Sequence, residues 1–118
     1  MPFDSISSLS TKAILSLAAD IMEERGHCKY SYFKKTGEVC CHTAIHLAAG
    51  GKVDFDEETF TYVPMIDAGY EAKNAFEQMI AFPVGTGICG WNNAHTKEEA
   101  VAALRSCAAT YKGDANAV

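Results

Sequence analysis

Cysteine and histidine side chains gather near residue 40 of this 118-residue chain, where a helix is expected to begin. The sequence G-E-V-C at residues 37–40 runs directly into C-H-T-A-I-H at residues 41–46. A helix start presents free backbone N–H groups and the positive end of the helix dipole, which lower the pKa of a thiol placed there. Cys40 is therefore a candidate catalytic nucleophile, with His42 or the more distant His95 as its base.

A packing role is the alternative for Cys40, and we favour it. Under the nucleophile hypothesis Asn92 or Asn93 would orient a histidine, as in a Cys-His-Asn triad. Cysteines outside disulfides are, however, among the most often buried residues. A small buried side chain at position 40 would let the preceding segment pack closely on the following helix.

A metal site is a weaker interpretation of the same region. His42 and His46 are one turn apart on a single helix face, so both could reach one Zn²⁺, and Cys28 could approach across a hairpin. The chain has no C-x-x-C pair, and solvent-facing histidines with buried cysteines explain the same residues. We therefore expect neither a metal nor any other cofactor.

A second polar segment, G-W-N-N at residues 90–93, comes just before a predicted helix start. Trp91 offers a stacking face, and the amides of Asn92 and Asn93 can donate to and accept from the edge of a ligand. With the nearby aromatic residues Tyr30 and Tyr32, they form the candidate ligand-binding set. The alternative is that the tryptophan anchors the core and the asparagines cap a turn.

Four helices and a hairpin are expected to position these groups. Apolar spacing of three and four residues predicts helices at residues 11–25, 41–49 and 68–82. The T-x-x-E sequence at residues 96–99 is a capping box that predicts the last helix, ending near Gly113. Alternation over residues 27–33, a turn at 34–37 and a return at 38–40 indicate a hairpin.

The predicted fold is thus α+β and mostly α, with about four helices packed on a small two-stranded antiparallel hairpin. We expect one domain over residues 1–118, with loose termini at 1–9 and 113–118. Residues 52–65 fit neither helix nor strand clearly. The glycine-rich stretch at 84–90 is expected to be a loop, because its match to G-x-G-x-x-G lacks a surrounding βαβ unit.

Charge and hydropathy exclude several classes of function. The net charge is −5 with a pI of about 5.2, which argues against binding duplex nucleic acid. Only Lys34 and Lys35 are adjacent basic residues, with Lys29 nearby. No apolar run approaches the roughly 18 residues of a membrane span. Five cysteines without an export signal indicate the reducing cytoplasm.

The order of these motifs resembles a family of small uncharacterised proteins from actinobacteria and their phages. Its pattern has an A-A-D helix, then G-x-V-C-x-x-x-A-L, then W-N-D before a T-x-x-E-V helix. The resemblance covers about two thirds of the chain and leaves out residues 52–65. Asn93 stands where the pattern has Asp, and Thr43 stands where it usually has Gly. The resemblance implies a small, phage-encoded cytosolic protein and carries over no activity.

From size, acidity and this resemblance we expect an accessory protein that binds a host protein or a small nucleotide-like ligand. Counter-defence is one concrete form of such binding. The alternative is a cysteine-dependent hydrolase or transferase with Cys40 as nucleophile. The oligomeric state is left open by the sequence, a homodimer included. A ligand pocket would lie between the hairpin, the helix start at Cys40 and the turn at residues 91–93.

Overall fold

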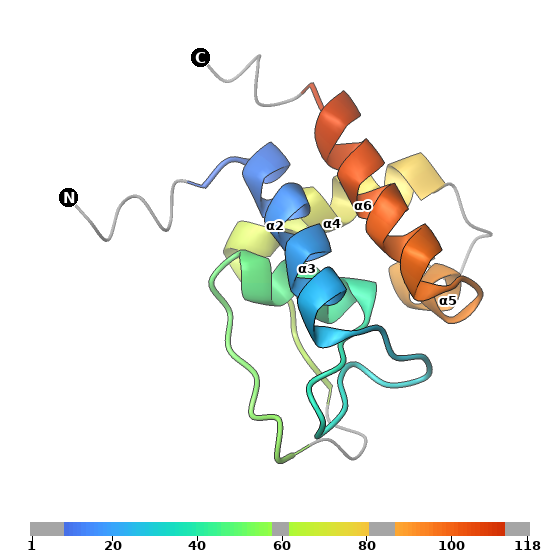
Figure 1. Cartoon of the computed structure of the whole chain (residues 1–118). Coiled ribbons are helices and arrows are strands. Elements are labelled where there is room, and N and C mark those ends of the chain that lie inside the picture. The colour runs from blue at the N-terminus through green and yellow to red at the C-terminus, as the bar shows by residue number, and fades with distance from the viewer. Residues whose placement is uncertain (1–8, 58–61, 81–86, 113–118) are drawn as a thin grey trace.

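The computed structural model describes residues 9–57, 62–80 and 87–112, which contain five α-helices and one short 3-10 helix (Figure 1). The predicted loose termini lie outside these residues, except for Leu9. The elements are α2 (Thr11–Arg25), α3 (Cys41–Ala48), η1 (Asp67–Gly69), α4 (Tyr70–Ile80), α5 (Gly87–Asn93) and α6 (Lys97–Thr110).

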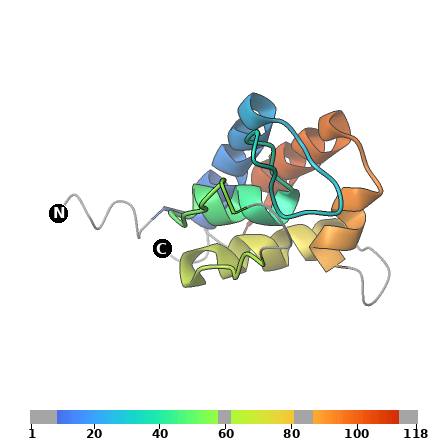
Figure 2. The same cartoon turned by 90° about the horizontal axis from the view of Figure 1, so that it is seen from below.

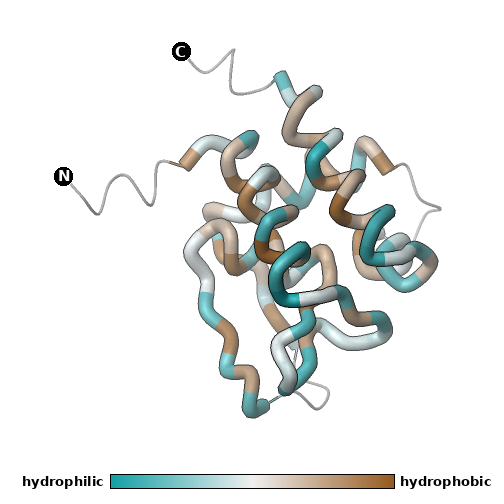
Figure 3. Tube along the Cα trace, in the orientation of Figure 1, coloured by the Kyte–Doolittle hydropathy of each residue, from teal (hydrophilic) through white to brown (hydrophobic). Residues whose placement is uncertain are grey.

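Local signals define the two longest helices, and both predictions are confirmed. The side chain of Ser10 accepts a hydrogen bond from the N–H of Ala13 at the start of α2, and Gly26 follows its last residue with a φ of +99°. At the start of α6 the capping box between Thr96 and Glu99 is complete in both directions. Hydrophobic and hydrophilic positions alternate along both helices (Figure 3).

The helices are arranged in two layers around one core. Helices α2 and α6 lie side by side and share the largest interhelical contact. Helices α3 and α4 form the layer beneath them (Figure 2). The largest fully buried apolar side chains of the core are Phe33, Phe76, Leu15, Met22, Ile45 and Leu104. The helices α2, α3, α4 and α6 and the loop that contains Phe33 thus all contribute side chains to the core.

The predicted two-stranded hairpin is wrong. Residues 27–40 contain only two isolated bridges, in which His27 pairs with Val39 in parallel and Phe33 pairs with Val39 antiparallel, and no strand occurs within the described ranges. The expected alternation is broken at Tyr30, whose φ is +64°. Its N–H is bound by the side chain of Asn93 rather than by a neighbouring strand. Residues 27–40 therefore form a loop, which Asn93 holds at Tyr30, in place of the expected pair of strands.

The glycine-rich stretch also differs from expectation. Residues 84–86 lie outside the described part of the chain, but Gly87 begins α5, which continues through the G-W-N-N segment to Asn93. The expected helix over 68–82 is present as η1 followed by α4, with residues 81 and 82 outside the described part. Helix α5 is what brings residues 89–93 against α3.

Candidate functional site

The side chain of Asn92 is completely buried and joins three separate segments. Its Oδ1 accepts a hydrogen bond from the N–H of Cys41 at 2.9 Å. The same oxygen lies 2.9 Å from Nε2 of His27, so that nitrogen carries the proton and donates. The amide Nδ2 donates to the carbonyl of Cys28 at 2.9 Å and lies 3.4 Å from Oδ1 of Asn93.

These bonds make Asn92 a remote cap of α3. The N-cap residue of that helix, Cys40, makes no capping hydrogen bond with its side chain. Asn92, which follows in α5, instead satisfies the first free N–H of the helix. Because both polar atoms of the amide are occupied by protein groups, the geometry favours the capping interpretation over direct contact with a ligand.

Trp91 is also turned into the molecule. Its ring meets the edge of Phe76 with 5.5 Å between the ring centroids and stacks on His95 at 3.9 Å. Nδ1 of His95 hydrogen bonds with the carbonyl of Trp91 at 2.7 Å. The tryptophan is therefore a core anchor, and His95 is held against it rather than presented as a base to Cys40.

Tyr30 is the most exposed large hydrophobic residue among those that the structure describes, with 81% of its surface accessible. It is the only non-glycine residue with positive φ in the part of the chain that the structure describes. Oδ1 of Asn93 accepts its N–H at 2.8 Å. The side chain of Asn93 thus binds the backbone of Tyr30, another member of the candidate ligand-binding set, while the tyrosine ring itself faces solvent.

Cys40 is only 3% exposed, in keeping with the packing role. Its Sγ lies 3.6 Å from Oγ1 of Thr43. Burial raises the pKa of the Cys40 thiol well above its usual range, and the influence of Cys89 adds to this effect. The Cys40 thiol therefore keeps its proton at neutral pH, which disfavours a role as nucleophile.

Cys89, on α5, is the thiol that sequence reasoning missed. It is half-buried, and the influence of Cys40 and Tyr32, together with the charge of Lys73, lowers its pKa to about 7 in spite of the opposing effect of burial. Burial, followed by the neighbouring Cys89, raises the pKa of Tyr32 to about 12. Residue spacing could not have indicated this cluster, because it depends on the contact between α3 and α5.

The histidines of α3 bind backbone rather than each other. Nε2 of His42 lies 2.7 Å from the carbonyl of Val63, and Nε2 of His46 lies 3.1 Å from that of Lys52. Nδ1 of His46 is buried without a hydrogen-bond partner. Burial is the main cause that lowers the pKa of His42. The two rings attach the segment 52–65, which contains neither helix nor strand where it is described, to α3.

The structure therefore does not bring Cys28, His42 and His46 together as the ligands of the alternative metal site. Cys28 donates to the carbonyl of Ser31 at 3.4 Å, and burial raises its pKa to about 11. No group of three His, Cys, Asp or Glu residues that could hold a metal ion occurs in residues 9–57, 62–80 and 87–112.

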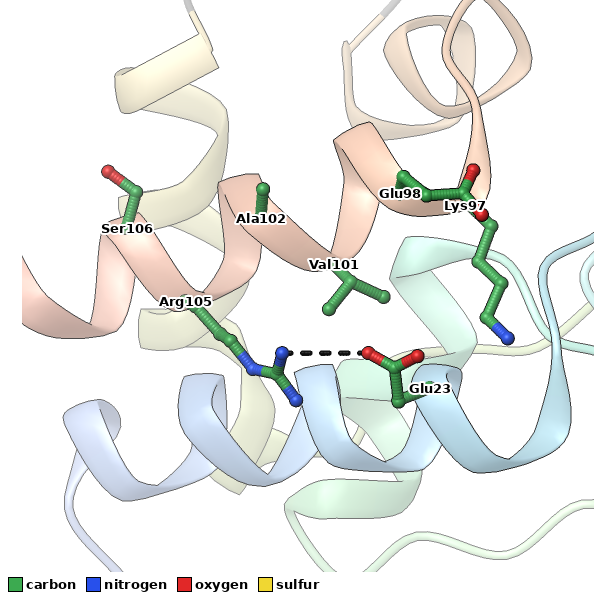
Figure 4. Close-up of a pocket in the computed structure, with 7 residues that line it drawn as sticks. All are labelled: Glu23, Lys97, Glu98, Val101, Ala102, Arg105 and Ser106. Atoms are coloured by element: carbon green, nitrogen blue, oxygen red, sulfur yellow. Dashed lines mark ion pairs between the residues drawn. The ribbon is translucent and has the colours of Figure 1, made fainter.

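A groove of about 550 Å³ runs between α2 and α6 (Figure 4). Arg105 spans it and forms ion pairs with Glu23 at 3.5 Å and with Asp20 at 3.3 Å. All three side chains are about half exposed, so these pairs contribute little to stability. The groove is lined by Glu23, Lys97, Glu98, Val101, Ala102, Arg105 and Ser106.

The chain belongs to the Family of unknown function (DUF6197), which matches residues 7–110. The match includes the residues 52–65 that the motif resemblance left out. No curated protein and no solved structure matches the chain. Within the described residues, no helix has the length and apolar character needed to cross a membrane.

Proposed function

We propose that this protein acts by binding a partner protein through the loop at residues 29–31. The observation that carries the proposal is the state of Tyr30, which is 81% exposed yet fixed at a φ of +64° by Asn93. A left-handed conformation costs a non-glycine residue roughly 1–2 kcal/mol. Such strain persists where the surroundings impose it, and it concentrates at functional sites.

A fixed, exposed tyrosine is well suited to protein recognition. Tyrosine offers a large amphipathic contact surface while only two side-chain torsions need to be ordered on binding. Tyrosine is also enriched among the residues that contribute most to binding energy at interfaces. The Asn93 bond orders the backbone of the loop in advance, which reduces the entropic cost of association.

Charge indicates the chemistry of the partner. Lys29 and Lys34 are exposed on the same loop, in a chain whose net charge is −5. A basic loop with an aromatic tip fits an acidic surface on another protein. A small nucleotide-like ligand is less well supported, because Trp91 and Asn92 are buried and committed to protein contacts.

We extend the proposal to the origin of the protein and the compartment in which it acts. The partner is a host protein, and the chain is an accessory protein of a phage or an actinobacterium that acts in the cytoplasm. Five free cysteines support a reducing compartment. Counter-defence, in which the loop covers a host effector, is one form of this activity. A homodimer would be compatible with the same exposed loop.

Photocrosslinking tests the proposal directly. Benzoylphenylalanine is introduced in place of Tyr30, and in a matched control in place of Tyr70, an exposed tyrosine on α4. We expect one acidic protein to be crosslinked from position 30 and not from position 70. With that protein purified, Tyr30→Ala should weaken binding at least roughly tenfold and Tyr70→Ala should not. The proposal would be refuted by identical adducts from both positions, by an adduct with nucleic acid, or by the absence of any adduct.

A further inference from the structure

We propose that Tyr32 and Tyr62 extend the partner-binding surface of Tyr30 onto a second segment of the chain. The partner then presents acidic residues to the loop at 29–31 and apolar residues to Tyr62. This inference rests on the proposed function and deepens it, because it states which chemistry the partner must carry and where. The second segment is residues 62–66, which precede η1.

The ring of Tyr32 joins the two segments. Tyr32 follows Tyr30 by two residues, and its ring contacts the ring of Tyr62 with 5.5 Å between the centroids and 85° between the planes. It also contacts the buried ring of His42 at 5.2 Å. Edge-to-face pairs of this kind are favourable arrangements of aromatic rings. The ring of Tyr62 is therefore held next to the loop.

Helix α3 fixes the backbone of both segments. The N–H of Cys40, the N-cap residue of α3, donates to the carbonyl of Tyr32 at 3.1 Å. Nε2 of His42, in the first turn, lies 2.7 Å from the carbonyl of Val63. Val63 is buried, so Tyr62 directly precedes an anchored residue. A partner that contacts both segments therefore meets a surface ordered in advance, which lowers the entropic cost of binding.

Tyr62 is exposed although its ring is held. It has 65% of its surface accessible, second only to Tyr30 among the large hydrophobic residues that the structure describes. Tyr32, which contacts the one and closely follows the other, is half-buried. Tyrosine is enriched among the residues that contribute most to binding at interfaces. The three rings together offer a larger contact area than Tyr30 alone.

The charge differs between the two ends of this surface. Lys29 and Lys34 are exposed on the loop that contains Tyr30. Tyr62 is instead followed by the sequence V-P-M-I at residues 63–66, in which no residue is charged. Charge complementarity assigns the acidic residues of the partner to the loop, and apolar side chains fit against Tyr62.

Crosslinking from two positions of the full chain tests the shared surface. Benzoylphenylalanine replaces Tyr62 in one protein and Tyr30 in another, with Tyr70 as the matched control. We expect positions 62 and 30 to capture the same protein. Peptide mapping of that protein should find acidic residues at the site reached from position 30 and apolar residues at the site reached from position 62. Different proteins from the two positions, or the opposite arrangement of charge, would overturn the inference.

Binding to the purified captured protein gives the second test. Tyr62→Ala should weaken binding at least about fivefold, whereas Tyr62→Phe, which keeps the ring, should stay within about twofold of the wild type. Tyr70→Ala should bind as the wild type does. If position 30 crosslinks but position 62 does not, or if Tyr62→Ala binds normally, this inference fails and the proposal for Tyr30 stands. The absence of an adduct from position 30 would refute both.

Discussion

Oδ1 of Asn92 accepts the N–H of Cys41 at 2.9 Å, so the first turn of α3 is completed by a buried side chain of α5. The same amide binds the backbone of Cys28 and the ring of His27. One residue therefore sets the relative position of α3, α5 and the loop that begins at Gly26.

We expect Asn92→Ala to lower the free energy of unfolding by about 3 kcal/mol, because it leaves several buried polar groups without partners. The matched control is Asn93→Ala, which removes the bond to the Tyr30 N–H and the longer contact with Asn92 at a half-buried position and should cost about 1 kcal/mol. Urea denaturation of both variants measures the difference. Equal losses would show that Asn92 is not the central connection.

Tyr30 offers a test of backbone strain. Glycine accepts a φ of +64° without the steric cost that any side chain incurs there. Tyr30→Gly should therefore be more stable than Tyr30→Ala by about 1 kcal/mol, the reverse of the usual order for a loop residue. Both variants should lose partner binding equally. If Tyr30→Ala is as stable as Tyr30→Gly in thermal denaturation, the backbone at position 30 is not strained.

The rate of alkylation reports the ionisation of Cys89. With iodoacetamide on the folded protein, the rate at Cys89 should rise with pH around a midpoint of about 7. In Cys40→Ala the largest influence that lowers the Cys89 pKa is absent, so the midpoint should move to higher pH. Cys28→Ala serves as the control and should leave the profile unchanged. A midpoint that does not respond to Cys40→Ala would refute the influence of Cys40 on the Cys89 pKa.

Acid should destabilise the protein through His42. Burial lowers its pKa in the folded state below the value of 6.5 that it has in the unfolded chain. Below pH 6.5 the unfolded chain therefore binds more protons, and the stability falls as the pH falls toward the folded-state pKa. His42→Gln keeps an amide donor for the carbonyl of Val63 but cannot titrate. Chemical denaturation from pH 7 to pH 5 should show a shallower loss for this variant, and an unchanged slope would contradict the assignment.

What the sequence predicted well depends on local interactions. Helices α2 and α6 follow from their apolar spacing and from caps only three residues from the groups they bind, as at Thr96 and Glu99. The prediction of a hairpin failed because the left-handed backbone of Tyr30 is fixed by Asn93, which is distant along the chain. The role of Cys89 was missed for a related reason, since α5 must form and pack on α3 before its thiol comes under the influence of Cys40.

The bonds of Asn92 and Asn93 also bear on how the native protein opens. The amide hydrogens of Cys41 and Tyr30 are both held by the end of α5. If α5 detaches from α3, both hydrogens become free to exchange with solvent in the same event. The exposed loop at Tyr30 therefore shares one opening free energy with the buried start of α3, and its exchange rate reports the detachment of α5 rather than motion of the loop alone.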